Sequence, residues 1–416
     1  MIALKKIKNT VFKYLLYLFV FEVLIFFILE LSFKHSFSYV PYYRLLVITF
    51  TFFFFFPILF FKTKRITLRL LTNEDYLVIG WCLFTIIELI HGMLIRNPLV
   101  YIVADFTYII FGGFIYLLLS NYISTNKTST IDFVNLSNFL LVIFVLFFFV
   151  NGFFSENYYF ILLSLCSVFL IEKKYKYVIL LIIPFLLQIK DSNRALLICF
   201  LTVVIFYFLY RITYFLRKND RLFIFTFSFF IFYFFYQEIL TLLFELVPKG
   251  SGLYYRLKQL LEILNKGINF NDPQYVSITQ RLIEAKVVIN LWFSDLLTFI
   301  FGCGLGSVID GNLFIDASVK NTALLGVESI HNIHLLPFAL IHKYGFFGLL
   351  IFIILVIDVL NSFNNLFKKN VHIAFIFWNL IFILIFIYSL PAASFLWTSP
   401  LFWISVSLKR KQIYIN

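Results

Sequence analysis

The sequence predicts an all-α polytopic membrane protein with about 12 transmembrane helices and one long extracytoplasmic loop between the ninth and tenth. Three observations support this. The 416-residue chain is 62% hydrophobic and only 13% charged, whereas a soluble domain is about a quarter charged. Its apolar residues form runs of about 20, the length that crosses a bilayer. Basic residues separate these runs, as they do in cytoplasmic connections.

The expected spans cover most of the chain. They lie near residues 11–31, 41–61, 76–95, 99–119, 134–154, 157–171, 176–190, 194–212, 222–247, 333–360, 371–390 and 394–408. The sixth and seventh spans are short and could be poorly tilted, broken or re-entrant. The tenth is long, and we expect a kink around Lys343, Tyr344 and Gly345.

The distribution of basic residues gives the orientation. Most of the 34 Lys and Arg residues fall in connections on one side, and the short connections on the other side hold Lys34, Arg44, Arg96, Lys190 and Arg194. Because cytoplasmic connections are enriched in Lys and Arg, we expect both termini in the cytoplasm. No small-residue cleavage site follows the first span, so we expect it to be retained.

The segment 248–332 interrupts this pattern as one long outside loop, with a helical stretch from Gln280 to Phe293. We therefore expect a single membrane domain, residues 1–416, with this loop inserted. A loop of this length in a compact protein is usually functional.

The net charge of +13 could indicate a nucleic-acid partner. The positive charges flank apolar runs instead of forming a patch, so we expect contact with membrane lipid and no nucleic acid. The four cysteines do not form a pattern that implies a disulfide framework.

Ionisable residues inside expected spans are candidates for function, because charge in lipid is unfavourable. Glu88 and His91 lie one helical turn apart and could pair, and Asp105 in the next span could join them. A proton relay and a polar cluster that stabilises packing are both open.

A glycine-rich stretch, residues 302–307, follows the helical part of the loop. Such a stretch can bind phosphate when it completes a nucleotide motif. No Gly-Lys-Ser/Thr follows here, so a tight turn is the favoured interpretation.

Two histidines, His331 and His334, precede the tenth span. Their spacing would suit zinc on one helix face, but no carboxylate or cysteine with ligand spacing accompanies them, so we expect no metal. The alternatives are one histidine acting as a base at the membrane surface and an interfacial structural histidine.

Two arginines, Arg194 and Arg281, lie on the expected outer side. A guanidinium presents a planar set of donors suited to phosphate. The competing interpretations are a side chain reaching the lipid surface for Arg194 and a surface pair with Glu284 for Arg281.

The order of these pieces resembles the bacterial O-antigen polymerase and O-antigen ligase superfamily, over about residues 190–350. The matching pieces are Arg194 at a helix start, Arg281 and Trp292 on a loop helix, residues 301–307, His331-Asn332, and residues 344–348. The first half of the chain matches only in being a run of apolar helices.

This resemblance implies a glycosyltransferase that acts on undecaprenyl-diphosphate-linked glycans at the periplasmic face of the inner membrane, with no metal or other cofactor. Arg194 and Arg281 would hold the diphosphate leaving group, and His331 would orient or deprotonate the acceptor hydroxyl. Asn332 would cap a helix or contact sugar. Backbone amides near Gly304, Gly306 and Ser307 would shape the site.

Within this resemblance, we expect a polymerase that joins lipid-linked repeat units. Ligases of the superfamily often carry a histidine two residues before the His-Asn pair, where this chain has Ser329. The alternatives are a ligase that transfers glycan to lipid A core and, outside enzymes, a lipid-linked oligosaccharide flippase. A polymerase would work with a chain-length regulator and a flippase as partners.

Overall fold

The computed structural model describes residues 46, 73–123, 133–150, 156–189, 194–215, 238, 241, 252–267, 269, 271–272, 275–314, 329–367 and 371–409. This part of the chain is mostly helical. The expected spans near 11–31, 41–61 and 222–247 lie outside the described residues, apart from one helical position in the second and two in the third.

The described elements are helices with one small sheet inserted. In order they are α3 (Asn73–Leu94), α4 (Leu99–Ile123), α5 (Phe133–Val150), α6 (Glu156–Ile171), α7 (Tyr175–Ile189), α8 (Arg194–Phe215), α10 (Gly252–Lys266), α11 (Val276–Trp292), α12 (Leu296–Phe301), β1 (Ile309–Asp310), η3 (Gly311–Phe314), β2 (Ser329–Ile330), α13 (Leu336–Leu366), α14 (Ile373–Ser389), α15 (Ser394–Thr398) and α16 (Pro400–Leu408). Strands β1 and β2 pair antiparallel, with Ile309 opposite Ile330.

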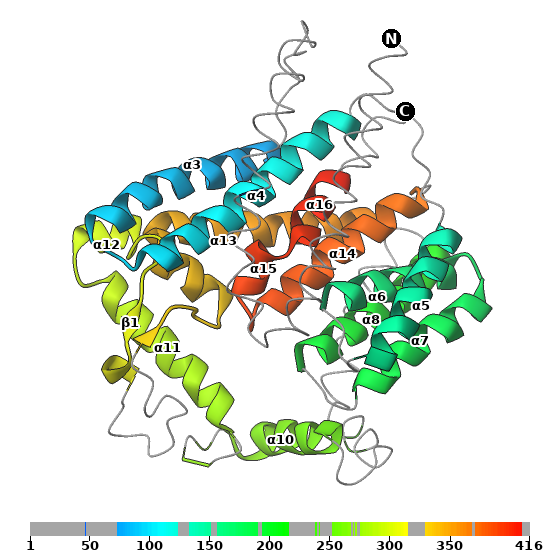
Figure 1. The fold of residues 1–416 in the computed structure, drawn as a ribbon. Coiled ribbons are helices and arrows are strands. Elements are labelled where there is room, and N and C mark those ends of the chain that lie inside the picture. Colours follow the sequence, from blue (N-terminus) through cyan, green and yellow to red (C-terminus); the bar gives the residue numbers. More distant parts are fainter. Residues whose placement is uncertain are drawn as a thin grey trace, which may run out of the picture.

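The helices form two neighbouring groups that meet at α14 (Figure 1). One group contains α3, α4, α13 and α16, and the other contains α5 to α8. Helix α14 packs against α13 and α16 on one side and against α6 and α8 on the other. Its side chains from Ile376 to Ile385 are almost all buried, which explains why this helix is apolar around its whole circumference.

Three described helices are long and apolar enough to cross a membrane by length and composition: Glu74–Leu94, Leu99–Leu117 and Leu336–Leu366. Several shorter helices are also apolar, among them α6 and α14. Large hydrophobic side chains such as Leu83, Ile90 and Ile357 are exposed on the long helices, as expected for surfaces that face lipid.

Most helices expected within the described residues are confirmed with shifts of a few residues at their ends. The expected loop helix is α11, which begins four positions earlier than predicted. The single helix expected near 394–408 is wrong, because it is divided into α15 and α16 at Ser399. Pro400 has no backbone N–H and favours an extended residue before it, and Ser399 has ψ 113°.

The expected kink in the tenth span is confirmed at Gly345, where φ is 57° and ψ is −134° inside α13. Glycine is required there by conformation and by space. A Cβ atom on Gly345 would lie 2.5 Å from the backbone nitrogen of Gly302. The break therefore allows the loop before α13 to contact the α13 backbone directly.

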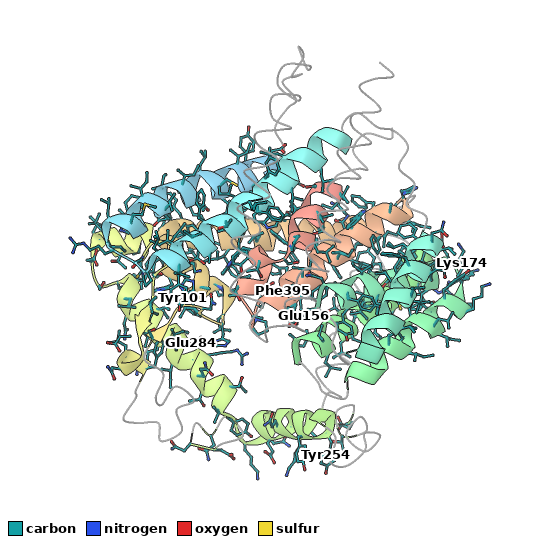
Figure 2. The ribbon with its side chains drawn as sticks, viewed as in Figure 1. Tyr101, Glu156, Lys174, Tyr254, Glu284 and Phe395 are labelled. Carbon is teal, nitrogen blue, oxygen red and sulfur yellow. The ribbon has the colours of Figure 1, made fainter. Side chains whose placement is uncertain are left out.

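One end of the helix assembly collects several connections, and we call it the loop end. It contains the α3–α4 turn, residues 302–307 and the start of α13. Helix α8 begins on this side, because Cys199 near its start contacts the carbonyl of Leu384 in the second half of α14 and Phe206, further along, contacts Phe367 at the opposite end of α13. In Figure 2, Tyr101 and Glu284 lie toward the left, at the loop end, and Lys174 lies at the far right.

Candidate functional site

The first cluster at the loop end, which we call the Asp105 cluster, is centred on a buried carboxylate of α4. Lys343 Nζ lies 2.5 Å from Asp105 Oδ1, and the backbone N–H of Gly306 donates to Oδ2 at 3.0 Å. His331 Nε2 lies 3.5 Å from Oδ1. Lys343 is almost fully buried, so its charge and that of Asp105 neutralise each other away from water.

His331 is held on three sides. Its Nδ1 donates to the carbonyl of Ser307 at 2.9 Å, its Nε2 faces Asp105, and its ring stacks on Tyr101 with centroids 4.2 Å apart. A carbonyl only accepts, so Nδ1 carries a hydrogen. The side chain is 10% exposed, which leaves little of the imidazole open to a substrate.

The glycine-rich stretch is a tight turn, as predicted. Gly302, Gly304 and Gly306 all have φ between 71° and 77°, a conformation that other residues rarely adopt. The amide of Asn97, in the α3–α4 turn, donates to the carbonyls of Cys303 and Leu305 at 2.9 Å each. These bonds fix the turn against α3 and α4.

The turn lies deep in the protein. Gly304, Gly306 and Ser307 are buried, and the Gly306 amide is already bonded to Asp105. The Ser307 hydroxyl lies 3.0 Å from Nε2 of His342, another buried residue. In this structure Gly304 packs closely against Gly92 of α3, Gly306 bonds to α4, and Ser307 contacts α13 and His331.

The second cluster, which we call the Glu284 cluster, lies between α11 and the segment before α13. Glu284 is completely buried, and both of its oxygens accept hydrogen bonds. The donors are Gln280 Nε2 at 3.1 Å, the backbone N–H of His334 at 3.0 Å, and His334 Nδ1 at 2.8 Å. The His334 side chain is 41% exposed.

Arg281 lies one helical turn from Glu284 on α11 and is half-buried. Its guanidinium donates to the hydroxyl and carbonyl of Ser277 and, at 3.4 Å, to the carbonyl of Pro391. Its Nε is buried and has no hydrogen-bond partner among the residues that the structure describes. Burial lowers the pKa of Arg281 below its usual value, and the negative charge of Glu284 opposes that shift.

The two other predicted contact residues lie at the same loop end. Arg194 is the first residue of α8. Asn332 is exposed, between His331 and the start of α13. The segment that follows α14 contacts the chain around the start of α13. The carbonyl of Leu390 accepts from the N–H of Leu336, and the N–H of Ala393 donates to the carbonyl of His334.

The structure resolves several alternatives that the sequence left open. Glu88 and His91 do pair, at 3.0 Å, but Asp105 pairs with Lys343 instead of joining them. Glu284 is not part of a surface pair, because it is fully buried against His334.

His331 and His334 face different carboxylates, and within the described residues no three His, Cys, Asp or Glu side chains gather as a metal site. The residues that sequence reasoning missed are Lys343, noted only for the kink, and His334 as the partner of Glu284. A lysine inside an apolar span was the available signal for the first.

Comparison of the chain with protein-family models, with curated proteins and with solved structures finds no match.

Proposed function

We propose that this protein is a glycosyltransferase that polymerises surface polysaccharide from undecaprenyl-diphosphate-linked repeat units. In this proposal the loop end faces the periplasm, the chain lies in the bacterial inner membrane, and both termini are cytoplasmic. The donor glycan leaves its lipid diphosphate and joins the acceptor hydroxyl of a second lipid-linked unit.

The observation that carries the proposal is the set of hydrogen-bond partners of Arg281. Its acceptors are the neutral oxygens of Ser277 and Pro391, and it forms no ion pair with any residue that the structure describes. The adjacent carboxylate, Glu284, is bonded to His334 and Gln280 instead. A half-buried guanidinium held in place by neutral acceptors is suited to bind an anion such as a diphosphate.

The surroundings of Arg281 are consistent with a lipid-linked substrate. Arg194 begins α8 at the same end, where a diphosphate would lie next to the apolar surface that holds its lipid chain. Exposed Asn332 offers an amide for sugar hydroxyls. As the bond to the diphosphate breaks, negative charge grows on the leaving group, and a fixed guanidinium stabilises that charge.

The first experiment is a lipopolysaccharide gel from a strain that lacks this gene. A lipid A core with a single repeat unit is the expected result, because transfer to the core and export continue without polymerisation. A bare core with polymer left on undecaprenyl diphosphate would replace the proposal with a ligase. A bare core without such polymer would indicate a flippase, and an unchanged ladder would contradict an O-antigen role.

The second experiment restores the gene with single substitutions. Arg281→Ala is expected to lower polymer formation by roughly 10²-fold or more, the usual effect of removing a preorganised donor to developing charge. Arg281→Lys keeps the charge but loses the planar donor set, so we expect partial recovery. The matched control is Arg211→Ala, near the opposite end of α8 from Arg194. Equal polymer in all strains at equal protein level would contradict the proposal.

A further inference from the structure

The Glu284 cluster contains a carboxylate–imidazole pair whose two halves differ sharply in exposure. The carboxylate of Glu284 is 0% exposed, and the His334 side chain is 41% exposed. His334 Nδ1 lies 2.8 Å and 3.1 Å from the two carboxylate oxygens. Only a protonated Nδ1 can donate to a carboxylate, so a neutral His334 would carry its lone pair on Nε2.

The orientation of this imidazole is fixed by its backbone as well as by its ring. The His334 N–H donates to Glu284 Oε2 at 3.0 Å, and the His334 carbonyl accepts from Ala393 at 2.9 Å. Gln280, one turn earlier on α11, donates a further hydrogen bond to the Glu284 carboxylate. Nε2 of His334 has no hydrogen-bond partner among the described residues, so the basic nitrogen is free while every other polar atom is held.

The same segment places His334 close to Arg281. Arg281 donates to the carbonyl of Pro391, and Ala393, two residues later, donates to the carbonyl of His334. Arg281 and Glu284 also lie one turn apart on α11. The basic nitrogen and the guanidinium of the proposed diphosphate site are therefore parts of one local structure.

We propose that His334 is the catalytic base of the reaction and that Glu284 is its positioning residue. This inference rests on the proposed glycosyl transfer and assigns the acceptor side of it to His334 instead of His331. His331 is the weaker candidate, because both of its nitrogens face protein groups and its ring is covered by Tyr101.

The step balances without a further reactant. The oxygen of the acceptor hydroxyl forms a bond to the anomeric carbon of the donor, and its proton passes to Nε2 of His334. The bond from the anomeric carbon to the diphosphate oxygen breaks, and its electron pair leaves on the diphosphate, whose charge Arg281 neutralises. The resulting imidazolium is stabilised by Glu284 until Nε2 releases the proton to water.

The experiment uses purified full-length protein in liposomes with lipid-linked repeat units extracted from the deletion strain. Variant His334→Ala is expected to lose about 10²-fold or more in rate per folded protein. Added imidazole is expected to restore part of that rate, because the exposed position leaves room for it. The matched control is His372→Ala, which removes a helix cap of α14 far from the loop end and should keep the wild-type rate.

A spectroscopic measurement tests the geometry without any activity. With ¹⁵N-histidine labelling, the protein gives signals from only six histidines, and His334→Gln identifies the one that belongs to His334. At a pH where the ring is neutral, we expect a protonated Nδ1 and a bare Nε2. In Glu284→Gln the negative charge that favours this tautomer is gone, so the commoner Nε2–H form should appear.

The outcomes separate this inference from the proposed function. No transfer by the wild-type protein would remove the proposed function itself. Transfer that requires Arg281 but continues at the wild-type rate in His334→Ala would leave the function intact and overturn the base assignment. Loss of rate without imidazole rescue, or a bare Nδ1 in the wild-type spectrum, would also overturn it.

Discussion

The Asp105 cluster and the Glu284 cluster contain the same kinds of side chain but differ in their exposure to solvent. Each contains a buried carboxylate paired with a histidine of the segment before α13, and a cation lies nearby. In the Asp105 cluster the cation pairs with the carboxylate and the histidine is covered. In the Glu284 cluster the cation bonds to neutral oxygens and the histidine is exposed.

This difference indicates which cluster stabilises the fold and which is available to a ligand. Lys343 and Asp105 compensate each other, so their positions restrain α4 and α13 and leave no net charge for a substrate. Arg281 and the free nitrogen of His334 keep their binding capacity. Residue type alone does not distinguish the two clusters, whereas the partner of each polar atom does.

The largest expected effect comes from the same amide substitution in both clusters. Asp105→Asn leaves the charge of buried Lys343 without a counter-ion, which costs about 3–5 kcal/mol in other proteins. Glu284→Gln disturbs the hydrogen bonds from Gln280 and His334 but leaves no buried charge without a counter-ion, so we expect a smaller loss. The two stability losses can be compared by heating each detergent-solubilised variant. The melting temperature is the one at which the variant no longer elutes as a single peak in size-exclusion chromatography.

A double variant controls for this interpretation. Asp105→Leu with Lys343→Met removes both charges and should recover much of the stability that Asp105→Asn loses. Equal melting temperatures for Asp105→Asn and Glu284→Gln would show that the two clusters do not differ in the way described.

The second effect concerns the turn that covers the Asp105 cluster. Gly302→Ala places a Cβ atom 2.5 Å from the Gly345 nitrogen and also strains a residue with φ 77°. Gly267 has the same φ, and no atom of the described residues lies within 4 Å of such a Cβ, so Gly267→Ala measures the strain alone, about 1–3 kcal/mol. We expect Gly302→Ala to lower the melting temperature clearly further, and a similar decrease in both variants would contradict the close approach.

A smaller effect is expected from Asn97→Ala. This change removes two hydrogen bonds to the carbonyls of Cys303 and Leu305, which together contribute roughly 1–2 kcal/mol. Asn312→Ala is the matched control, because Asn312 is an exposed residue of η3. Hydrogen exchange of residues 302–307, followed by mass spectrometry, should increase only in Asn97→Ala, and unchanged exchange would contradict the anchoring role.

The smallest effect is a pH-dependent one at Asp295, the N-cap residue of α12. Its side chain accepts from the hydroxyl and N–H of Thr298, and these bonds hold the pKa of Asp295 below its ordinary value of 3.8. A lowered folded-state pKa means that the carboxylate stabilises the fold above pH 3.8 and loses that effect as pH falls further. Asp295→Ala should therefore melt earlier than the wild type at pH 6, and the difference should shrink as the pH falls below 3.8.

The sequence predicts the helices well and the partners in the clusters poorly. Runs of apolar residues are local, so α3, α13 and α14 could be placed within a few residues. The kink near Gly345 and the tight turn at 302–307 were also predicted, because glycine carries that information locally.

The pairing of Asp105 with Lys343 joins residues 238 positions apart, and no local pattern encodes it. Glu284 seemed to pair with Arg281 because they are one turn apart on the same helix. Glu284 is instead buried against His334, because the segment before α13, distant in sequence, supplies its N–H and imidazole donors.

The break at Gly345 also leaves one part of α13 with about the length that crosses a lipid bilayer. A straight helix of 31 residues would be about 46 Å long, well beyond the roughly 30 Å thickness of the hydrocarbon layer. The part after the break, residues 346–366, extends about 31 Å and is long enough to cross that thickness. The turns before it, which carry Lys343, would then lie at headgroup depth, so protein atoms and not the hydrocarbon layer separate the Lys343–Asp105 pair from water.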